Sequence, residues 1–69
     1  MNGTLLREYI KDAGFTVTSF ARKIGISREA LYSKLSGKRE FKLSEINMVT
    51  QLLSLSDKER DAIFFAKSD

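Results

Sequence analysis

A glycine between two short amphipathic segments constrains this chain more than any other feature. Gly25 stands between two apolar patterns: the first ends at Ile24, and the second begins at Ile26. Glycine enters the left-handed backbone region without a side-chain clash, so it suits the end of a helix and a sharp turn. The hydroxyl of Ser27 can then accept a hydrogen bond from an amide in the first turn of the next helix. Residues 18–37 are therefore predicted to form two helices that cross at a steep angle.

These two predicted helices divide their residues between an inner and an outer side. A small residue at the crossing and apolar residues at the corner allow close packing: Ala21, Ile24, Ile26, Leu31 and Leu35. The side chains left on the outer side of the second helix are polar: Arg28, Glu29, Tyr32 and Ser33. A helix presented in this way fits the major groove of DNA.

Residues 20–28 (Phe-Ala-Arg-Lys-Ile-Gly-Ile-Ser-Arg) and 35–39 (Leu-Ser-Gly-Lys-Arg) resemble the Cro and lambda-repressor-like family of helix-turn-helix DNA-binding proteins. Residues 43–46 and 63–65 extend the similarity to small regulators from the lysis-lysogeny switches of temperate phages. The small alanine, the turn glycine and the apolar spacing are fairly specific together. The resemblance implies an all-α fold, a compact bundle of about five short helices that contains the helix-turn-helix.

Length and composition narrow the functional classes. The chain has 69 residues, which suits one small domain that buries only about 60 % of its unfolded surface. It contains no cysteine and no histidine, which removes disulfides, thiolate and imidazole metal sites, and the Cys–His and Ser–His catalytic pairs. We therefore expect one domain over residues 1–69 that is not an enzyme and uses no cofactor or metal.

The N-terminal stretch is polar and amphipathic, unlike a signal peptide, and the longest apolar run, residues 62–66, is too short to cross a bilayer. These features predict a soluble cytoplasmic protein, and the resemblance implies the cytoplasm of a bacterial host cell.

Positive charge is concentrated in the predicted motif and the loop after it. Residues 22–42 hold seven basic and two acidic residues, a net charge of +5, whereas the rest of the chain has a net charge of −2. Such an asymmetry is expected of a surface that faces phosphates.

Further helices are predicted on both sides of the motif. Apolar residues recur at spacings of three and four along residues 4–13, which predicts an amphipathic helix that ends at Gly14. This helix is expected to be a scaffold that covers the motif. Thr18 is expected to cap the next helix.

The helix after the motif is predicted over residues 43–53. Its expected inner face is Leu43, Ile46, Val49, Thr50 and either Leu52 or Leu53. Ser44 is a candidate cap for this helix, since the side chain of Lys42 cannot accept a hydrogen bond.

The last predicted helix begins with a capping box of Ser56 and Glu59 and runs to about residue 66. It ends in an apolar cluster that contains Ile63, Phe64 and Phe65. Two interpretations stand for this cluster. Phe64 and Phe65 either fold back to complete the core, or part of the cluster is an interface with another subunit or a different protein.

The resemblance implies which residues touch double-stranded DNA. Base contacts are expected from the exposed side of the second motif helix: Arg28, Glu29, Tyr32 and Ser33. Phosphate contacts are expected from hydroxyls, amides and cations around it: Thr18, Ser19, Lys34, Lys38 and Arg39. Lys34 stands where many family members have an apolar residue, so Leu35 is expected to take over the packing.

Three of these assignments have a structural alternative. Arg28 can pair with a neighbouring carboxylate, Glu29 can complement the positive end of its own helix, and Tyr32 can serve mainly in packing.

Two functional classes follow. The first is a sequence-specific transcriptional regulator of a phage genetic switch, a Cro-like repressor that binds a partly palindromic operator as a homodimer. The second is a modulator of repression, which binds the phage repressor protein and alters or blocks its DNA binding. The charge asymmetry favours DNA, whereas Glu29 and the aromatic C-terminal cluster favour a protein partner.

Overall fold

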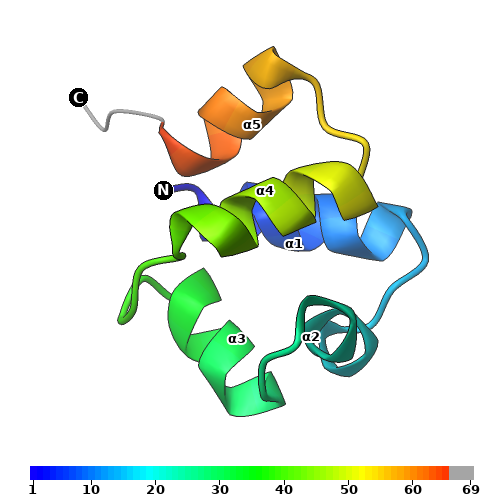
Figure 1. Cartoon of the computed structure of the whole chain (residues 1–69), viewed down its shortest axis with the longest axis vertical. Helices are drawn as coiled ribbons and strands as arrows, with labels where there is room; N and C mark the ends of the chain where they lie inside the picture. Colours follow the sequence, from blue (N-terminus) through cyan, green and yellow to red (C-terminus); the bar gives the residue numbers. More distant parts are fainter. Residues whose placement is uncertain (66–69) are drawn as a thin grey trace.

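The computed structural model describes residues 1–65, and this part of the chain is all-α (Figure 1). Its five helices are α1 (Gly3–Asp12), α2 (Val17–Ile24), α3 (Arg28–Leu35), α4 (Leu43–Leu52) and α5 (Asp57–Phe64). The predicted fold class, a bundle of about five short helices with a helix-turn-helix, is confirmed.

Local signals set several of the helix ends. Gly14 has a φ of 88° just after α1, and Gly25 has a φ of 80° at the end of α2. The Ser56 hydroxyl accepts from the Glu59 N–H at 3.1 Å, and the Glu59 carboxylate accepts from the Ser56 N–H at 2.8 Å. Both glycine stops and the capping box agree with the sequence prediction because each depends only on residues a few positions apart.

The start of α2 corrects the sequence prediction. The cap is Thr16 and not Thr18: the Thr16 hydroxyl accepts from the Ser19 N–H at 3.0 Å, and the Ser19 hydroxyl accepts from the Thr16 N–H at 2.9 Å. Two threonines lie two residues apart, and only Thr16 has a partner three residues on that completes the reciprocal bond. Thr18 therefore lies inside the first turn of α2, exposed.

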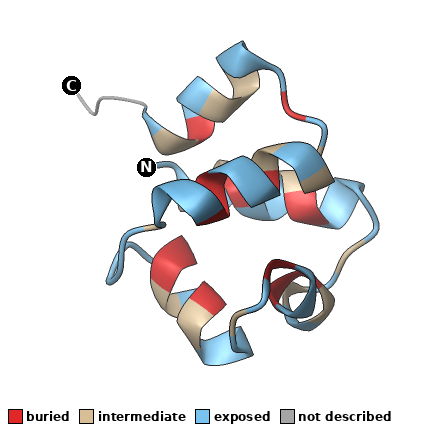
Figure 2. Cartoon of the chain, viewed as in Figure 1, coloured by how far each residue is buried: buried red, intermediate tan, exposed pale blue. Residues whose placement is uncertain are grey.

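The core forms where the five helices face one another (Figure 2). Its fully buried members come from every helix: Leu6 and Ile10 of α1, Phe20 and Ala21 of α2, Leu31 of α3, Val49 of α4 and Ile63 of α5. Phe15 packs edge-to-face on Phe20, with ring centroids 5.2 Å apart. Because α1 contributes to this core and contacts α2, α3 and α5, it holds the motif against the rest of the bundle.

The inner face of α4 differs from the prediction at its first residue. Leu43 is 70 % exposed, whereas Glu45, Ile46 and Val49 are buried. The inward side of α4 is the one that carries Glu45, Ile46 and Val49, and Leu43 does not lie on it. The Ser44 cap is also wrong: α4 begins after Lys42, whose N–H donates to the Glu45 carboxylate at 2.8 Å.

The N-terminal and C-terminal helices are joined by two hydrogen bonds. The Asn2 N–H donates to the Ile63 carbonyl at 2.7 Å, and the Tyr9 hydroxyl donates to the Glu59 carboxylate at 2.9 Å. Helix α5 ends at Phe64, and Ala66, to which it was expected to run, lies outside the described residues. None of the helices in residues 1–65 has both the length and the apolar character needed to cross a membrane.

Candidate nucleic-acid interface

The turn between α2 and α3 fixes how α3 is presented. The Ile26 N–H donates to the Ala21 carbonyl at 3.0 Å, which closes the turn around Gly25. The Ser27 hydroxyl accepts from the Ala30 N–H at 3.0 Å and so caps α3, as the sequence predicts. With Ala21 and Ile24 buried behind it, α3 has one side against α2 and α1 and the other side outward.

The outward side of α3 brings together the four residues predicted to contact bases. Arg28, Glu29 and Tyr32 are exposed and Ser33 is half-buried, while Leu31 and Leu35 are buried on the opposite side. Residues one turn apart share a helix face, so these polar groups form one surface. Within the described chain Arg28 forms no ion pair with a carboxylate, which leaves its guanidinium free for a ligand.

Tyr32 lies beside two arginines, one of them from outside the motif. Its ring centroid is 6.0 Å from the guanidinium carbon of Arg28 and 5.6 Å from that of Arg7 in α1. Both distances are within the range of a cation–π contact. Sequence reasoning did not identify Arg7, because only the packing of α1 on α3 brings it to the motif.

The loop after α3 is tied to the end of that helix. The Ser33 carbonyl accepts from the Lys38 N–H at 3.0 Å, the Arg39 N–H at 3.2 Å and the Ser36 hydroxyl at 3.0 Å. Gly37 adopts a φ of 85° inside this turn. Lys38 and Arg39 are exposed. The loop therefore holds two cations next to the outward side of α3.

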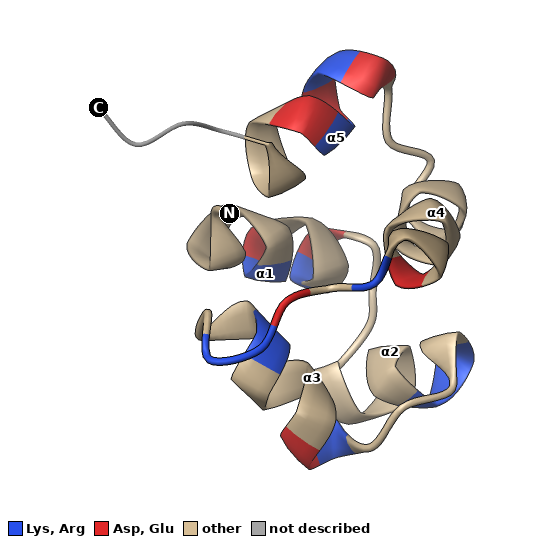
Figure 3. Ribbon diagram, turned by 60° about the vertical axis from the view of Figure 1, so that its left-hand side comes forward, with Lys and Arg blue, Asp and Glu red and all other residues tan. Residues whose placement is uncertain are grey.

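Charge is unevenly distributed over the molecule (Figure 3). Lys and Arg gather in the loop between α3 and α4 and at the end of α2, whereas the start of α3 and α5 each carry both signs. The positive side of the molecule is therefore the side of the helix-turn-helix.

The start of α2 offers backbone donors as well as hydroxyls. The Ser19 N–H is taken by Thr16 Oγ1, and the Phe20 N–H by the Thr16 carbonyl. The amides of Val17 and Thr18 precede them and have no intrahelical acceptor by helix geometry. Ser19 uses its hydroxyl in the capping box, so Thr18 is the residue here with a free hydroxyl and a free amide on the surface.

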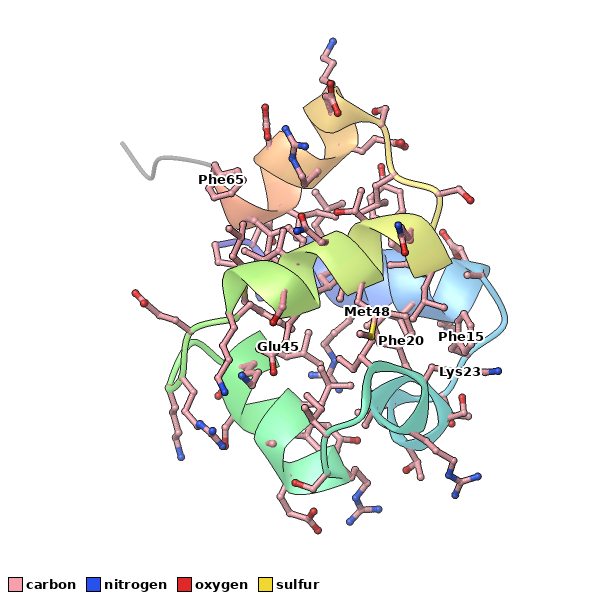
Figure 4. All side chains as sticks on the ribbon, in the orientation of Figure 1. Phe15, Phe20, Lys23, Glu45, Met48 and Phe65 are labelled. Carbon is pink, nitrogen blue, oxygen red and sulfur yellow. The ribbon has the colours of Figure 1, made fainter. Side chains whose placement is uncertain are left out.

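Lys34 corrects the predicted set of phosphate contacts. Its side chain is only 2 % exposed, and its ammonium donates to Glu45 Oε1 at 2.6 Å and to the Glu40 carbonyl at 3.3 Å. Glu45 points from α4 towards α3 (Figure 4). An ammonium enclosed in this way is not available to DNA, and the side chain of Lys34 instead joins α3 to α4.

The Glu45 carboxyl group is held in its charged form. Burial opposes its ionisation, but hydrogen bonds from the Lys34 ammonium and the Lys42 N–H, with the charges of both lysines, lower its pKa below the ordinary value. The pair is therefore ionic, and it joins the last turn of α3 to the first turn of α4.

The aromatic end of α5 is divided between core and surface. Ile63 is fully buried, so its assignment to a protein interface is wrong. Phe64 is half-buried and packs edge-to-face on Phe41, with centroids 5.3 Å apart. Phe65 is 55 % exposed and lies at the outer edge of the molecule (Figure 4). Of the three residues named for an interface, Phe65 is the one that remains largely accessible.

Among residues 1–65 no three His, Cys, Asp or Glu side chains cluster as a metal ion would require. The outward face of α3 and the loop after it instead offer positive charge and hydrogen-bond donors.

Of three comparisons with known proteins, one gave a match, and it agrees with this geometry. Neither the curated proteins nor the solved structures gave a match. A family model, described as the Cro/C1-type HTH DNA-binding domain, matches residues 5–57, which is more than half of the chain and includes all of α2 and α3. The chain therefore belongs to the Cro/C1-type helix-turn-helix family of DNA-binding domains.

Proposed function

We propose that this protein is a sequence-specific transcriptional regulator of a phage genetic switch, a Cro-like repressor that reads operator DNA with α3 in the major groove. The observation that carries the proposal is the outward face of α3, where Arg28, Glu29, Tyr32 and Ser33 stand clear of the core. The basic loop beside that face supports it. Such a regulator represses by occupying promoter DNA.

The side chains on α3 differ in what they recognise. The planar guanidinium of Arg28 can donate to O6 and N7 of guanine together, which discriminates by roughly 1–3 kcal/mol against the wrong base. Glu29 can accept from the amino group of cytosine. Ser33, one turn further on, reaches a base edge only where the groove is approached closely.

Phosphate contacts then set the position of α3 along the groove. Lys38 and Arg39 supply cations on one side of α3. On the other side, donors come from Thr18 and from the first turn of α2, which the capping box of Thr16 and Ser19 closes. Donors on both sides of a reading helix hold it in register without reading sequence themselves.

We further infer that two copies bind one operator. One reading helix contacts few base pairs, and helix-turn-helix dimers read half-sites about 34 Å apart. The described chain measures 31 Å along its longest axis, so two copies at that spacing lie side by side. The exposed ring of Phe65 is the apolar group that we assign to their contact.

A second candidate is a modulator of repression that binds a phage repressor protein. Two observations favour it: Phe65 exposes an aromatic ring, and Glu29 places a negative charge beside Arg28 at the start of α3. A basic DNA-reading surface on a repressor would attract that carboxylate.

Selection of random DNA duplexes, followed by anisotropy titration of the enriched duplexes at two salt concentrations, tests the first proposal. We expect a partly palindromic sequence bound at nanomolar strength, with an affinity that falls steeply as salt rises. No enriched sequence, with only weak binding to every duplex, would reject the autonomous reader and favour the modulator.

A further inference from the structure

Arg7 belongs to α1, outside the helix-turn-helix, but its guanidinium lies over the exposed ring of Tyr32 on α3, with 5.6 Å between guanidinium carbon and ring centroid. The same two residues line a shallow surface groove between the start of α1 and the end of α3. Ser33 and Lys38 line it as well. The groove therefore continues the reading face of α3 towards α1.

The donors of Arg7 are free to bind a ligand. Arg7 is exposed, and within residues 1–65 its guanidinium has neither a carboxylate within ion-pair distance nor a hydrogen-bond acceptor. A guanidinium that stacks on an aromatic ring uses its flat face and leaves the N–H groups at its edge unoccupied. The cation–π contact with Tyr32, at 5.6 Å, occupies none of the N–H donors of Arg7.

The position of the guanidinium favours a phosphate over a base edge as its acceptor. Arg7 lies on α1, beside the reading helix, and the groove that it lines also contains Lys38 of the basic loop. Cations beside a helix that occupies the major groove meet the sugar-phosphate backbone along the groove edge. Arginine suits this acceptor because two of its N–H groups match two phosphate oxygens.

We propose that Arg7 is a phosphate-binding residue of the DNA interface, contributed by α1 and held in place by the ring of Tyr32. The proposal rests on DNA reading by α3, and it extends the interface beyond the helix-turn-helix to the N-terminal helix. Tyr32 then serves mainly as the platform between the guanidinium groups of Arg7 and Arg28.

The test uses the full chain and a duplex that the wild-type protein selects. Arg7→Met removes the donors and the charge, and Arg7→Lys keeps a charge and N–H donors but lacks the planar fork that matches two phosphate oxygens. Lys58→Met is the matched control, because it removes one positive charge from α5, away from the motif (Figure 3). Circular dichroism confirms that each variant is folded, and binding is measured by anisotropy over a series of salt concentrations.

Arg7→Met is expected to weaken binding to every sequence by about tenfold and to reduce the slope of log affinity against log salt by about 0.9, with the base preference unchanged. Arg7→Lys is expected to restore the slope and only part of the affinity. In a Tyr32→Leu background, Arg7→Met is expected to have less than half of its effect on log affinity, because the guanidinium has lost its platform.

An Arg7→Met effect no larger than that of Lys58→Met would overturn the proposal. A changed base preference with an unchanged salt slope would overturn it too, since Arg7 would then act on base reading. Arg28→Ala separates the two levels of inference. If Arg28→Ala relaxes the preference at one base pair in each half-site and Arg7→Met has no effect, only the role of Arg7 fails. If the wild-type protein selects no sequence, the proposed function fails.

Discussion

Lys34 of α3 and Glu45 of α4 form a buried ion pair, with 2.6 Å between the ammonium nitrogen and Oε1 and side-chain exposures of 2 % and 12 %. The Lys42 N–H donates to the same oxygen at 2.8 Å. One carboxylate thus joins the end of α3, the end of the basic loop and the start of α4. This pair therefore connects α3 to α4 across the loop between them.

Removing one partner of the pair is predicted to destabilise the fold. Lys34→Met keeps the packing of the side chain but leaves the Glu45 carboxylate partly buried without its ammonium, so we expect a loss of about 3 kcal/mol in the free energy of unfolding. Urea denaturation measures it. The double variant Lys34→Met with Glu45→Leu, in which no charge remains buried, is expected to recover most of the loss. A single-variant loss below about 0.5 kcal/mol, the range of ordinary surface changes, would contradict the role of the pair.

The same pair predicts a loss of stability in acid. The pKa of Glu45 in the folded protein lies below its ordinary value of 4.5, so the unfolded chain takes up this proton first as the pH falls. The contribution of Glu45 is therefore complete above about pH 4.5 and is lost as the pH falls through the lower, folded pKa. Urea denaturation between pH 7 and pH 3 is expected to show a smaller decrease for Glu45→Gln than for the wild type. Equal decreases would show that Glu45 is not responsible.

The parts of the fold that the sequence predicts are those set by neighbouring residues. The turn at Gly25, the Ser27 cap and the box of Ser56 and Glu59 each depend on groups within five positions of one another. Which of Thr16 and Thr18 caps α2 is also decided by nearby residues. A reciprocal partner three residues later, Ser19 in this case, is the signal that distinguishes the correct threonine.

The remaining features depend on contacts between distant segments. The burial of Lys34 needs Glu45, eleven residues further along the chain, and the sequence signal for it was the family resemblance, which implies an apolar residue at this position. Arg7 meets Tyr32 only because α1 packs on α3. Periodicity along one helix carries no information about such pairs, so sequence reasoning treated Lys34 as a free cation and Arg7 as part of a scaffold.

Gly3 is predicted to be intolerant of a side chain. A Cβ atom added at Gly3 would collide with the carbonyl oxygen of Leu35 at the end of α3, and a backbone atom cannot move aside as a flexible side chain would. We expect Gly3→Ala to lower the free energy of unfolding by about 1–3 kcal/mol, the usual cost of overpacking. Thr4→Ala, an exposed change at the next residue, is the control for thermal denaturation, and equal melting temperatures for the two variants would contradict the close approach of α1 and α3.

Phe65 is predicted to support the homodimer. Because its ring is 55 % exposed, Phe65→Ser removes apolar surface without opening the core, so the folded monomer is expected to keep its stability. Sedimentation velocity is expected to show a dimer for the wild type at micromolar concentration and a shift towards monomer for Phe65→Ser. Leu43→Ser, at an apolar residue that is 70 % exposed, is the matched control. A wild-type protein that is monomeric both free and on its selected DNA would reject the dimer.

Arg28 and Lys38 are predicted to differ in how their loss affects DNA binding. Arg28→Ala removes a bidentate base contact, so the preference at one base pair in each half-site is expected to relax, at a cost of about 1–3 kcal/mol on the selected sequence. Lys38→Ala removes a phosphate contact and is expected to weaken selected and unselected sequences alike, with a salt slope lower by about 1. Anisotropy titrations on a matched pair of duplexes that differ at one base pair separate the two effects. If Arg28→Ala weakens both duplexes equally, Arg28 contacts the backbone and not a base, and the docking of α3 in the groove has to be revised.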